Sequence, residues 1–259
     1  MIDTHVHFNG KDLSGDVPGL ITRAENAGVH QFVVIGYDLA SSERAVAQAE
    51  ADTRLFAVVG IHPHDARAWN QHSEKRLREL AESSRVVAIG EIGLDFYRDL
   101  SPRLAQYEAF RAQLTLAKKM GLPVVIHCRD AYPEAMALLE TEAGDTPVLL
   151  HCFAGDHSHA ERAWARNWYL GVGGTVTYKK NDELRTVVRD APQSCLLLET
   201  DAPYLSPEPM RGKFPNEPAR VPLVAARVAE IRSETVTQVE AYTNANARRL
   251  FPALSAVTA

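Results

Sequence analysis

The side chains most able to do chemistry in this 259-residue chain are histidines and acids that end or follow short apolar runs. Six of the ten histidines occupy such positions, namely His5, His7, His62, His64, His127 and His151. Acidic residues are placed similarly at Glu91, Glu199 and Asp201. Imidazole and carboxylate groups bind divalent metal ions and transfer protons in catalysis. Their recurrence at the ends of apolar runs therefore indicates a metal site or an acid–base site.

His5 and His7 are separated by one residue in the run IDTHVHF. Side chains two positions apart on a strand point to the same side, so both imidazoles could bind one ion, although a satisfied structural pair is an alternative. Glu91 lies within the apolar run AIGEIGLD. A buried carboxylate is costly unless it is paired or coordinated, so Glu91 is either a metal ligand that could bridge two cations or half of an internal salt bridge.

Three further runs end in comparable residues: PVVIH at His127, VLLH at His151 and LLLETD at Asp201. The predicted metal ligands are His5, His7, Glu91, His127, His151 and Asp201. Six nitrogen and oxygen ligands exceed the need of one open tetrahedral site and suit two ions that share a carboxylate and a water. Asp201 could also accept a proton from that water, and Glu199 could orient a ligand imidazole. Asp201, Glu91 and Glu199 are therefore the predicted catalytic residues.

Eight apolar runs must position these residues, and they begin near Ile2, Gln31, Leu55, Val86, Pro123, Pro147, Tyr169 and Cys195. They are nearly continuous in Val, Ile and Leu, as in parallel strands buried on both faces. Eight strand–helix alternations over about 250 residues predict an α/β fold of the (β/α)8 TIM-barrel type. A doubly wound open sheet is the alternative, but its glycine-rich fingerprint is missing after the first run. In a barrel the predicted site lies at the carboxyl ends of the strands.

Amphipathic segments between these runs predict the helices. They are expected at Pro18–Ala27, Ser42–Ala51, Ser73–Glu82, Arg103–Met120, Ala131–Glu142, His157–Asn167 and Asn181–Asp190, with two more at Ala219–Arg232 and Thr237–Leu250. No linker, low-complexity segment or internal repeat interrupts the pattern. We therefore expect a single domain over residues 1–259.

The composition, with 46% hydrophobic and 24% charged residues, is typical of a soluble globular protein. The sequence contains no stretch of about 18 uncharged apolar residues, so it predicts no membrane span. The first residues do not resemble a signal peptide, and we therefore expect a cytoplasmic protein. Three cysteines are too few for a disulfide framework, and we expect Cys128 and Cys152 to point away from the barrel axis. A net charge of -5 argues against broad coating of nucleic acid. Nothing in the sequence indicates an obligate protein partner.

Several blocks resemble, in order and over essentially the whole chain, the TatD-like deoxyribonucleases, which are amidohydrolase-type metal-dependent hydrolases. These blocks are IDTHVHF, VGIHPHD, AIGEIGLDFYR, PVVIHCRDA, LLHCFAG, GVGGTVTYKK, LLLETDAPYL and PNEPA. The resemblance implies a divalent-metal phosphodiesterase, typically a 3′–5′ exonuclease on DNA, with some members acting on RNA. It also implies the same six metal positions and places His62, Arg129 and Glu199 near metal and substrate. Many amidohydrolase relatives bridge their ions with a carboxylated lysine, but no lysine occurs in the eight runs, and Glu91 takes the fourth-strand end.

Groups near the predicted metals could hold a phosphodiester of DNA or a short oligonucleotide. The predicted substrate-binding residues are His62, His64, Arg129, Tyr204 and Arg211. Arginine suits this task because its planar fork matches phosphate oxygens. Zinc, manganese, nickel, iron or magnesium would fit the ligand types. Two alternatives stay open: hydrolysis of another ester or amide, such as an aminoacyl-tRNA ester or a lactone, and a metal-binding scaffold without catalysis.

Overall fold

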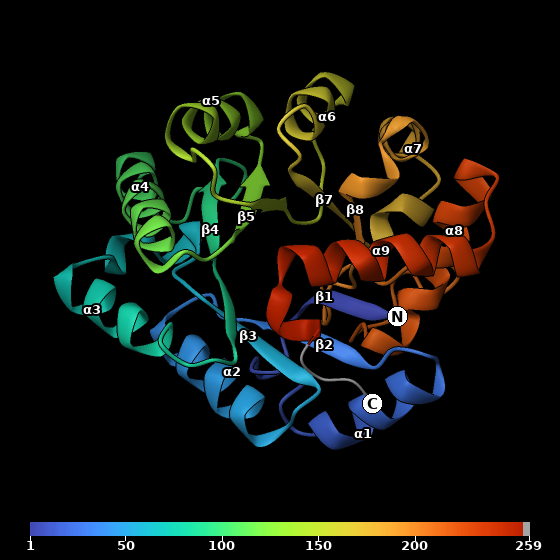
Figure 1. The fold of residues 1–259 in the computed structure, drawn as a ribbon, viewed down its shortest axis with the longest axis horizontal. Helices are drawn as coiled ribbons and strands as arrows, with labels where there is room; N and C mark the ends of the chain where they lie inside the picture. The colour runs from blue at the N-terminus through green and yellow to red at the C-terminus, as the bar shows by residue number, and fades with distance from the viewer. Residues whose placement is uncertain (256–259) are drawn as a thin grey trace.

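The computed structural model describes residues 1–255 as eight parallel strands alternating with helices (Figure 1). The strands are hydrogen-bonded in chain order, β1 to β8. They are β1 (Ile2–Val6), β2 (Gln31–Ile35), β3 (Leu55–Val59), β4 (Val86–Asp95), β5 (Val124–Arg129), β6 (Val148–Leu150), β7 (Tyr169–Val172) and β8 (Leu196–Leu198). This arrangement confirms the (β/α)8 fold that the alternation of runs predicts.

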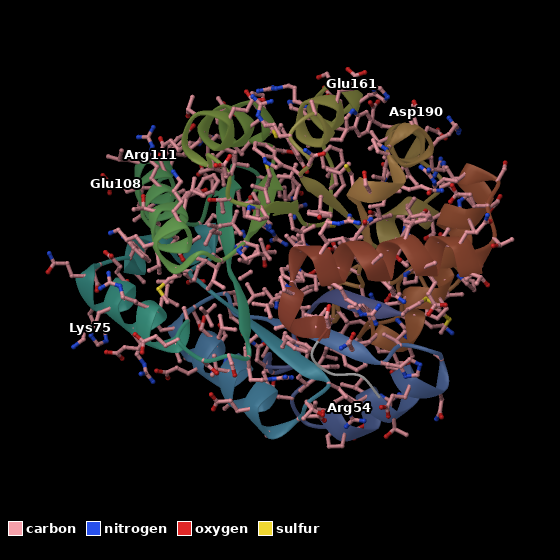
Figure 2. All side chains as sticks on the ribbon, viewed as in Figure 1. Arg54, Lys75, Glu108, Arg111, Glu161 and Asp190 are labelled. Atoms are coloured by element: carbon pink, nitrogen blue, oxygen red, sulfur yellow. The ribbon has the colours of Figure 1, made fainter. Side chains whose placement is uncertain are left out.

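The helices pack around the outside of the strands. They are α1 (Val17–Asn26), α2 (Leu39–Ala51), α3 (Gln71–Leu80), α4 (Arg103–Met120), α5 (Tyr132–Glu142), α6 (His157–Trp164), α7 (Asp182–Asp190), α8 (Val221–Arg232) and α9 (Val236–Leu250). Short 3-10 turns add η1 (Pro63–Ala68), η2 (Gly174–Thr177), η3 (Gln193–Cys195), η4 (Pro218–Arg220) and η5 (Pro252–Ser255). Figure 2 shows Lys75, Arg111 and Glu161 pointing outward from α3, α4 and α6. In the part of the chain that the structure describes, no helix is long and apolar enough to cross a membrane.

The barrel closes where the segment after β8 meets β1. A parallel bridge joins Val6 and Ala202, and the His7 N–H donates to the Ala202 carbonyl over 2.8 Å. Deeper in the barrel, the buried Asp3 carboxylate accepts hydrogen bonds from the Thr200 N–H over 3.0 Å and from its hydroxyl over 2.6 Å. The first and last strands are therefore held together by both backbone and side-chain bonds.

Alternating residues of a regular strand such as β2 face two different apolar layers. Val34 belongs to the larger layer between strands and helices, together with α4 residues such as Phe110. Its neighbour Val33 belongs to the smaller layer inside the barrel, with Phe56 and Val125. This alternation turns every second strand residue toward the barrel axis. Polar residues in the inward register, when they lie at the carboxyl ends of the strands, therefore meet above the inner layer.

The chain after β8 closes the opposite end of the barrel. In Figure 1, α9 crosses in front of β1 and β8. Phe251 and Leu254, which follow α9, join the inner apolar layer. Gln31 at the start of β2 donates to the Leu254 carbonyl over 2.9 Å, and Asn246 donates to the Leu196 carbonyl over 2.9 Å. The amino ends of the strands are thus covered, which leaves the carboxyl ends as the open face.

Candidate metal centre

All six predicted metal ligands come together at the carboxyl ends of the strands. His5 lies in β1, Glu91 in β4 and His127 in β5. The remaining members follow strands: His7 and His151 come directly after β1 and β6, and Asp201 lies shortly after β8. These side chains fall into overlapping groups whose ligand atoms lie within 4.8 Å of one another. Strand alternation and the common end of the barrel therefore produce the cluster from positions far apart in the sequence.

A first group contains His5, His7 and Asp201. Asp201 Oδ1 lies 3.3 Å from His7 Nε2 and 3.7 Å from His5 Nε2. His5 Nε2 also lies 3.5 Å from Glu91 Oε2. Two ligand atoms about 2.1 Å from one tetrahedral ion are roughly 3.4 Å apart, so these separations leave room for an ion between them.

A second group contains Glu91, His127 and His151. Glu91 Oε1 lies 2.9 Å from His127 Nδ1 and 3.4 Å from His151 Nε2. Glu91 Oε1 faces this group, whereas Glu91 Oε2 faces His5. Glu91 therefore serves both groups, one oxygen to each.

Buried polar atoms without partners support the fit of a metal ion. Among the described residues, neither ring nitrogen of the fully buried His5 has a hydrogen-bond partner, and Glu199 Oε2 has none. Burying such atoms unsatisfied is costly, so an ion that takes up the lone pair of His5 Nε2 would remove part of that cost. The donor set of neutral imidazole and carboxylate is the one that divalent transition metals prefer.

Neighbouring charges set the protonation of these groups in the metal-free protein. Burial alone would raise the pKa of the Glu91 carboxyl, but the surrounding histidines hold it well below its usual value. Burial and the nearby His151 lower the pKa of His5, whose ring stacks 3.6 Å from that of His151. Burial would also lower the pKa of His151, yet Glu199 and Glu91 raise it to about 10. Metal binding must therefore displace a proton from His151, whereas His5 offers a lone pair directly.

Glu199 holds His151 from beneath. Its Oε1 lies 3.0 Å from His151 Nδ1 and accepts a hydrogen bond from the Cys152 N–H over 2.6 Å. The neighbouring strand makes room for it, because a Cβ on Gly171 would overlap the Glu199 carboxylate. Glu199 thereby leaves His151 Nε2 turned toward Glu91, which is the orienting contact expected of a residue behind a metal ligand.

His62 and His64 lie beside His127, at the edge of the second group. The His62 ring is 4.3 Å from that of His127, and its Nδ1 accepts a hydrogen bond from the His64 N–H over 3.1 Å. Burial and the nearby His127 lower the pKa of His62 to about 4. A neutral His62 whose Nδ1 accepts must carry its hydrogen on Nε2, 3.6 Å from Glu91 Oε1. His62 thus presents an N–H donor to the site rather than a lone pair.

The other predicted substrate residues lie at different distances from the cluster. Tyr204 is 52% exposed, and its ring lies 6.1 Å from that of His7. Arg129 ends β5 with its guanidinium 3.9 Å above the ring of Tyr97. Arg211 stacks on Tyr178, 4.1 Å from the ring centre, and pairs with Glu208; within residues 1–255 it makes no ion pair with the six clustered ligands. The structure therefore brings Tyr204 and Arg129 to the mouth and leaves Arg211 at its outer rim.

Three residues near the cluster were missed by the sequence analysis. Asp95 ends β4 and lies 2.8 Å from His64 Nε2 and 3.0 Å from His127 Nε2. Asp3 lies below His5, and the Tyr37 ring lies 5.7 Å from that of His7. Residue parity could have found the two acids, because Asp95 is four residues after Glu91 and Asp3 is two residues before His5. Tyr37 carries no such signal.

Strand alternation does not determine the orientation of Cys152. β6 ends at Leu150, so strand alternation no longer applies two residues later. Cys152 has a positive φ of 42°, and it is half-buried, whereas Cys128 is buried in β5 as expected. The turn after β6 therefore sets the direction of this side chain.

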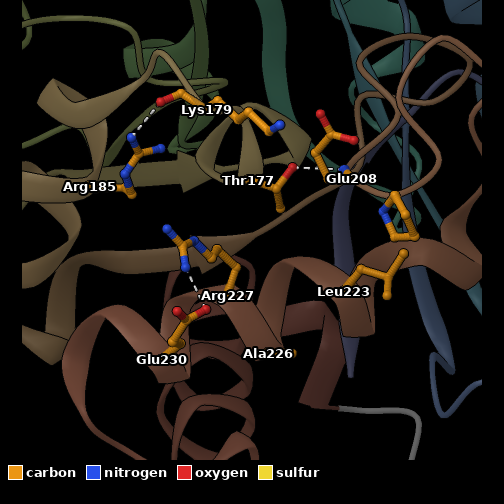
Figure 3. A pocket seen from close by; sticks show the side chains of 9 residues that line it. Thr177, Lys179, Arg185, Glu208, Leu223, Ala226, Arg227 and Glu230 are labelled. Atoms are coloured by element: carbon orange, nitrogen blue, oxygen red, sulfur yellow. Dashed lines mark hydrogen bonds and ion pairs between the residues drawn. The ribbon is translucent and has the colours of Figure 1, made fainter.

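A separate hollow of about 590 Å³ lies beside the mouth, between the loops after β7 and β8 and helix α8 (Figure 3). Its lining includes Lys179, Glu208, Arg227 and Glu230. Arg227 contacts Glu230 over 2.5 Å, so two of these charges are already paired. None of the clustered metal ligands lines this hollow. It is therefore distinct from the metal centre.

Known proteins resemble this chain over nearly its whole length. The chain matches the family described as TatD related DNase over residues 2–252. It is 42% identical over 256 residues to the 3′-5′ ssDNA/RNA exonuclease TatD of Cronobacter sakazakii, covering 97% of both chains. It is 38% identical over 252 residues to an uncharacterized metal-dependent hydrolase, YabD, of Bacillus subtilis, covering 97% of this chain and 98% of the relative.

A solved structure shares the fold closely. YJJV, a TatD homologue from Escherichia coli K12, superposes with a TM-score of 0.92 at 33% sequence identity, covering 97% of this chain and 98% of that one. Both the family match and the relatives extend over nearly the whole length. The chain belongs to the TatD related DNase family of metal-dependent hydrolases.

Proposed function

We propose that this protein is a divalent-metal-dependent 3′–5′ exonuclease that hydrolyses phosphodiester bonds in single-stranded DNA and short oligonucleotides. The observation that carries the proposal is Glu91, whose two oxygens face two separate groups of histidines on the open end of the barrel. The substrate class follows the relative at 42% identity, which is named as a 3′-5′ exonuclease of single-stranded DNA and RNA.

The ligand geometry favours two ions. His5, His7 and Asp201 would hold one, His127 and His151 the other, and Glu91 would contact both. When bound, such a pair supplies an activated water and positive charge to stabilise an attacked phosphodiester. Four imidazoles and two carboxylates suit zinc, manganese or nickel, and magnesium is the further candidate.

The chain's own residues would do the remaining work. Asp201 would accept the proton of the attacking water, because its side chain is 13% exposed and lies beside His5 and His7. His62 would donate its Nε2–H to a phosphate oxygen. Arg129 on Tyr97 offers a positively charged fork at the mouth for a neighbouring phosphate. The metal ions and Arg129 would concentrate positive charge at one end of the barrel. This suits binding of a nucleic-acid strand terminus by a protein whose net charge is -5.

Digestion of end-labelled single-stranded DNA tests the proposal. The purified protein is treated with chelator, reconstituted with each metal, and incubated with the same oligonucleotide labelled at the 5′ or the 3′ end. A 3′–5′ exonuclease should release the 3′ label first as a mononucleotide and should shorten the 5′-labelled strand stepwise. The chelator-treated protein should be inactive.

A parallel substrate panel distinguishes the alternatives. Aminoacyl-tRNA, a lactone, an amide and bis-nitrophenyl phosphate are incubated with the same metal-loaded protein. Hydrolysis of an amide or carboxylic ester without cleavage of any nucleic acid would overturn the nuclease proposal and keep a metal-dependent hydrolase. Absence of turnover on every substrate, with both sites loaded, would favour a scaffold.

A further inference from the structure

Asp95 is a fully buried carboxylate at the end of β4, outside the proposed ligand set. Its two oxygens face different parts of the molecule. Oδ1 accepts hydrogen bonds from the backbone N–H groups of Tyr97 and Arg98, over 3.0 and 2.7 Å. Oδ2 lies 2.8 Å from Nε2 of His64 and 3.0 Å from Nε2 of His127. One carboxylate therefore ties the loop after β4 to two histidines of the open face.

These contacts determine which nitrogen of His127 is free. An ionised carboxylate can only accept hydrogen bonds, so the ring nitrogens that face Asp95 Oδ2 must carry hydrogens. With a hydrogen on Nε2, a neutral His127 has its lone pair on Nδ1. Nδ1 is the atom that lies 2.9 Å from Glu91 Oε1, at the second group of ligands.

We propose that Asp95 is a positioning residue that keeps the hydrogen of His127 on Nε2 and so presents Nδ1 as a metal ligand. The same oxygen holds His64 at the edge of the site. This places Asp95 in the role toward His127 that Glu199 has toward His151, with each carboxylate behind one histidine of the second group. The inference rests on the proposed function for the use of the metal, but it concerns metal binding itself.

The same contacts argue against a third metal site. His62, His64 and His127 lie close enough to form another group of possible ligands. However, His64 and His127 direct a hydrogen toward Asp95, and His62 Nδ1 already accepts from a backbone N–H. His62 therefore has no free lone pair, and the lone pair of His127 lies on Nδ1, which faces Glu91, so these three rings do not offer three free ligand atoms to one ion.

Asp95→Asn is the sharpest test because asparagine has the same shape. Its carbonyl oxygen can still accept from the two backbone N–H groups, but its amide N–H₂ then meets the two ring N–H groups. His127 can relieve this clash only by moving its hydrogen to Nδ1, where it blocks the metal. In zinc titrations of the chelator-treated variant, we expect the zinc affinity of the site that contains His127 to fall about 10–100-fold. The zinc affinity of the other site should stay at the wild-type value.

Asp99→Asn is the matched control, because it removes one carboxylate from the exposed part of the same loop. This control should bind two zinc ions as the wild type does. Long-range ¹H–¹⁵N NMR of the zinc-loaded wild type should show the hydrogen of His127 on Nε2. That spectrum uses the unchanged protein, so a hydrogen on Nδ1 would overturn the proposal even if Asp95→Asn does not fold.

Three results would overturn the proposal. They are wild-type affinity for both zinc ions in a folded Asp95→Asn, equal weakening of zinc binding at both sites, and a hydrogen on Nδ1 of His127 in the wild-type spectrum. None of these measurements contains nucleic acid. A protein that binds zinc as expected but leaves DNA intact would therefore contradict the proposed substrate and not the role of Asp95.

Discussion

Glu91 connects the two halves of the candidate centre because its two carboxylate oxygens point to different histidines. A carboxylate in this position costs little only while positive charge surrounds it, and the surrounding histidines supply that charge in the metal-free protein. An ion would replace those protons with a more concentrated charge. The site therefore exchanges protons for metal, and metal affinity should increase as the pH rises.

Asp201→Asn tests the proposed proton acceptor. Asparagine keeps the size of the side chain and one oxygen, but it cannot take up a proton from water. We expect a folded protein that still contains zinc and whose kcat on single-stranded oligonucleotides falls by about 10²–10⁴. Thermal unfolding, zinc content and kcat are measured on one preparation. A zinc-loaded variant with the wild-type kcat would remove Asp201 as the base.

Asp3→Asn tests the pH dependence of stability. Burial raises the pKa of Asp3 from 3.8 to about 7, against the opposing hydrogen bonds of Thr200 and the His5 N–H. The folded chain therefore binds an extra proton between these values, and the contribution of Asp3 to stability, complete below pH 3.8, is lost as the pH rises through 7. Asparagine removes the charge and keeps an acceptor for the two N–H groups.

For the metal-free variant, we expect the free energy of unfolding to exceed that of wild type by roughly 1–3 kcal/mol at pH 8 and to match it near pH 4. Urea unfolding of the chelator-treated proteins at pH 4, 6 and 8 provides the measurement. If the difference in the free energy of unfolding between the two proteins did not change with pH, the pKa of Asp3 would not differ between the folded and unfolded chains in this range.

Residues of the candidate site could be predicted where side chains alternate along a strand. Asp95 was missed because the alternation was not extended to the end of its strand. His5 and His7 are two residues apart, as alternation requires, and the structure brings both to Asp201 although the pairing of β1 with β2 shifts register between Asp3 and Val6. Asp95 follows from the same rule, since it has the parity of Glu91, but nothing in the sequence says that it faces histidines rather than solvent. The direction of Cys152 could not be predicted, because it depends on a turn with positive φ.

At the scale of elements, β7 is shaped by the need to pass beneath Glu199. Gly171 lies where any Cβ would overlap that carboxylate, whereas a Cβ on Gly173 would lie 3.6 Å from the Glu199 Cγ, an ordinary contact. Both glycines belong to the short run GVGG. Their different surroundings show that a strand can contribute to the metal centre through an absent side chain.

The pair Gly171→Ala and Gly173→Ala tests this role. Gly171→Ala should displace Glu199 from His151 and weaken zinc binding about 10–100-fold, because the orienting contact is lost. Gly173→Ala should bind zinc as the wild type does. Zinc titration and thermal unfolding of both variants make the comparison. Equal zinc affinities in the two variants would contradict the idea that Gly171 makes space for Glu199.

The elements themselves were largely predictable from periodicity. Helix α4 spans the expected residues, and the strands begin within one residue of the expected positions. Helix α2 begins at Leu39, three residues before the prediction, because Asp38 caps it by accepting a hydrogen bond from the Ser41 N–H. The 3-10 turns were not predicted, since such short segments depend on local contacts rather than on a repeating pattern.

At the scale of the whole molecule, the two ends of the barrel have separate tasks. The carboxyl ends of the strands carry the candidate metal centre, and the amino ends are closed by α9 and the residues that follow it. In this fold, changes at the closed end are expected to alter stability, and changes at the open end to alter chemistry.

Phe251→Ala tests this separation. Phe251 is fully buried in the inner apolar layer, so its loss should leave a cavity and lower the free energy of unfolding by about 3–5 kcal/mol. Zinc stoichiometry and kcat of the folded protein should stay at wild-type values. Denaturant unfolding gives the first quantity and zinc titration the second. Loss of zinc binding without loss of stability would mean that the two ends are coupled.

The closure between β1 and the segment after β8 has a consequence for biosynthesis. Asp3 and Thr200, which join there, are 197 residues apart along the chain, and the first group of ligands spans the same junction. Most of the chain must therefore be synthesised and leave the ribosome before that group can assemble. Translation products that end before residue 201 would lack Asp201 and with it the proposed proton acceptor. A cell that makes such a nuclease would be protected from its incomplete copies by the order in which the ligands are synthesised.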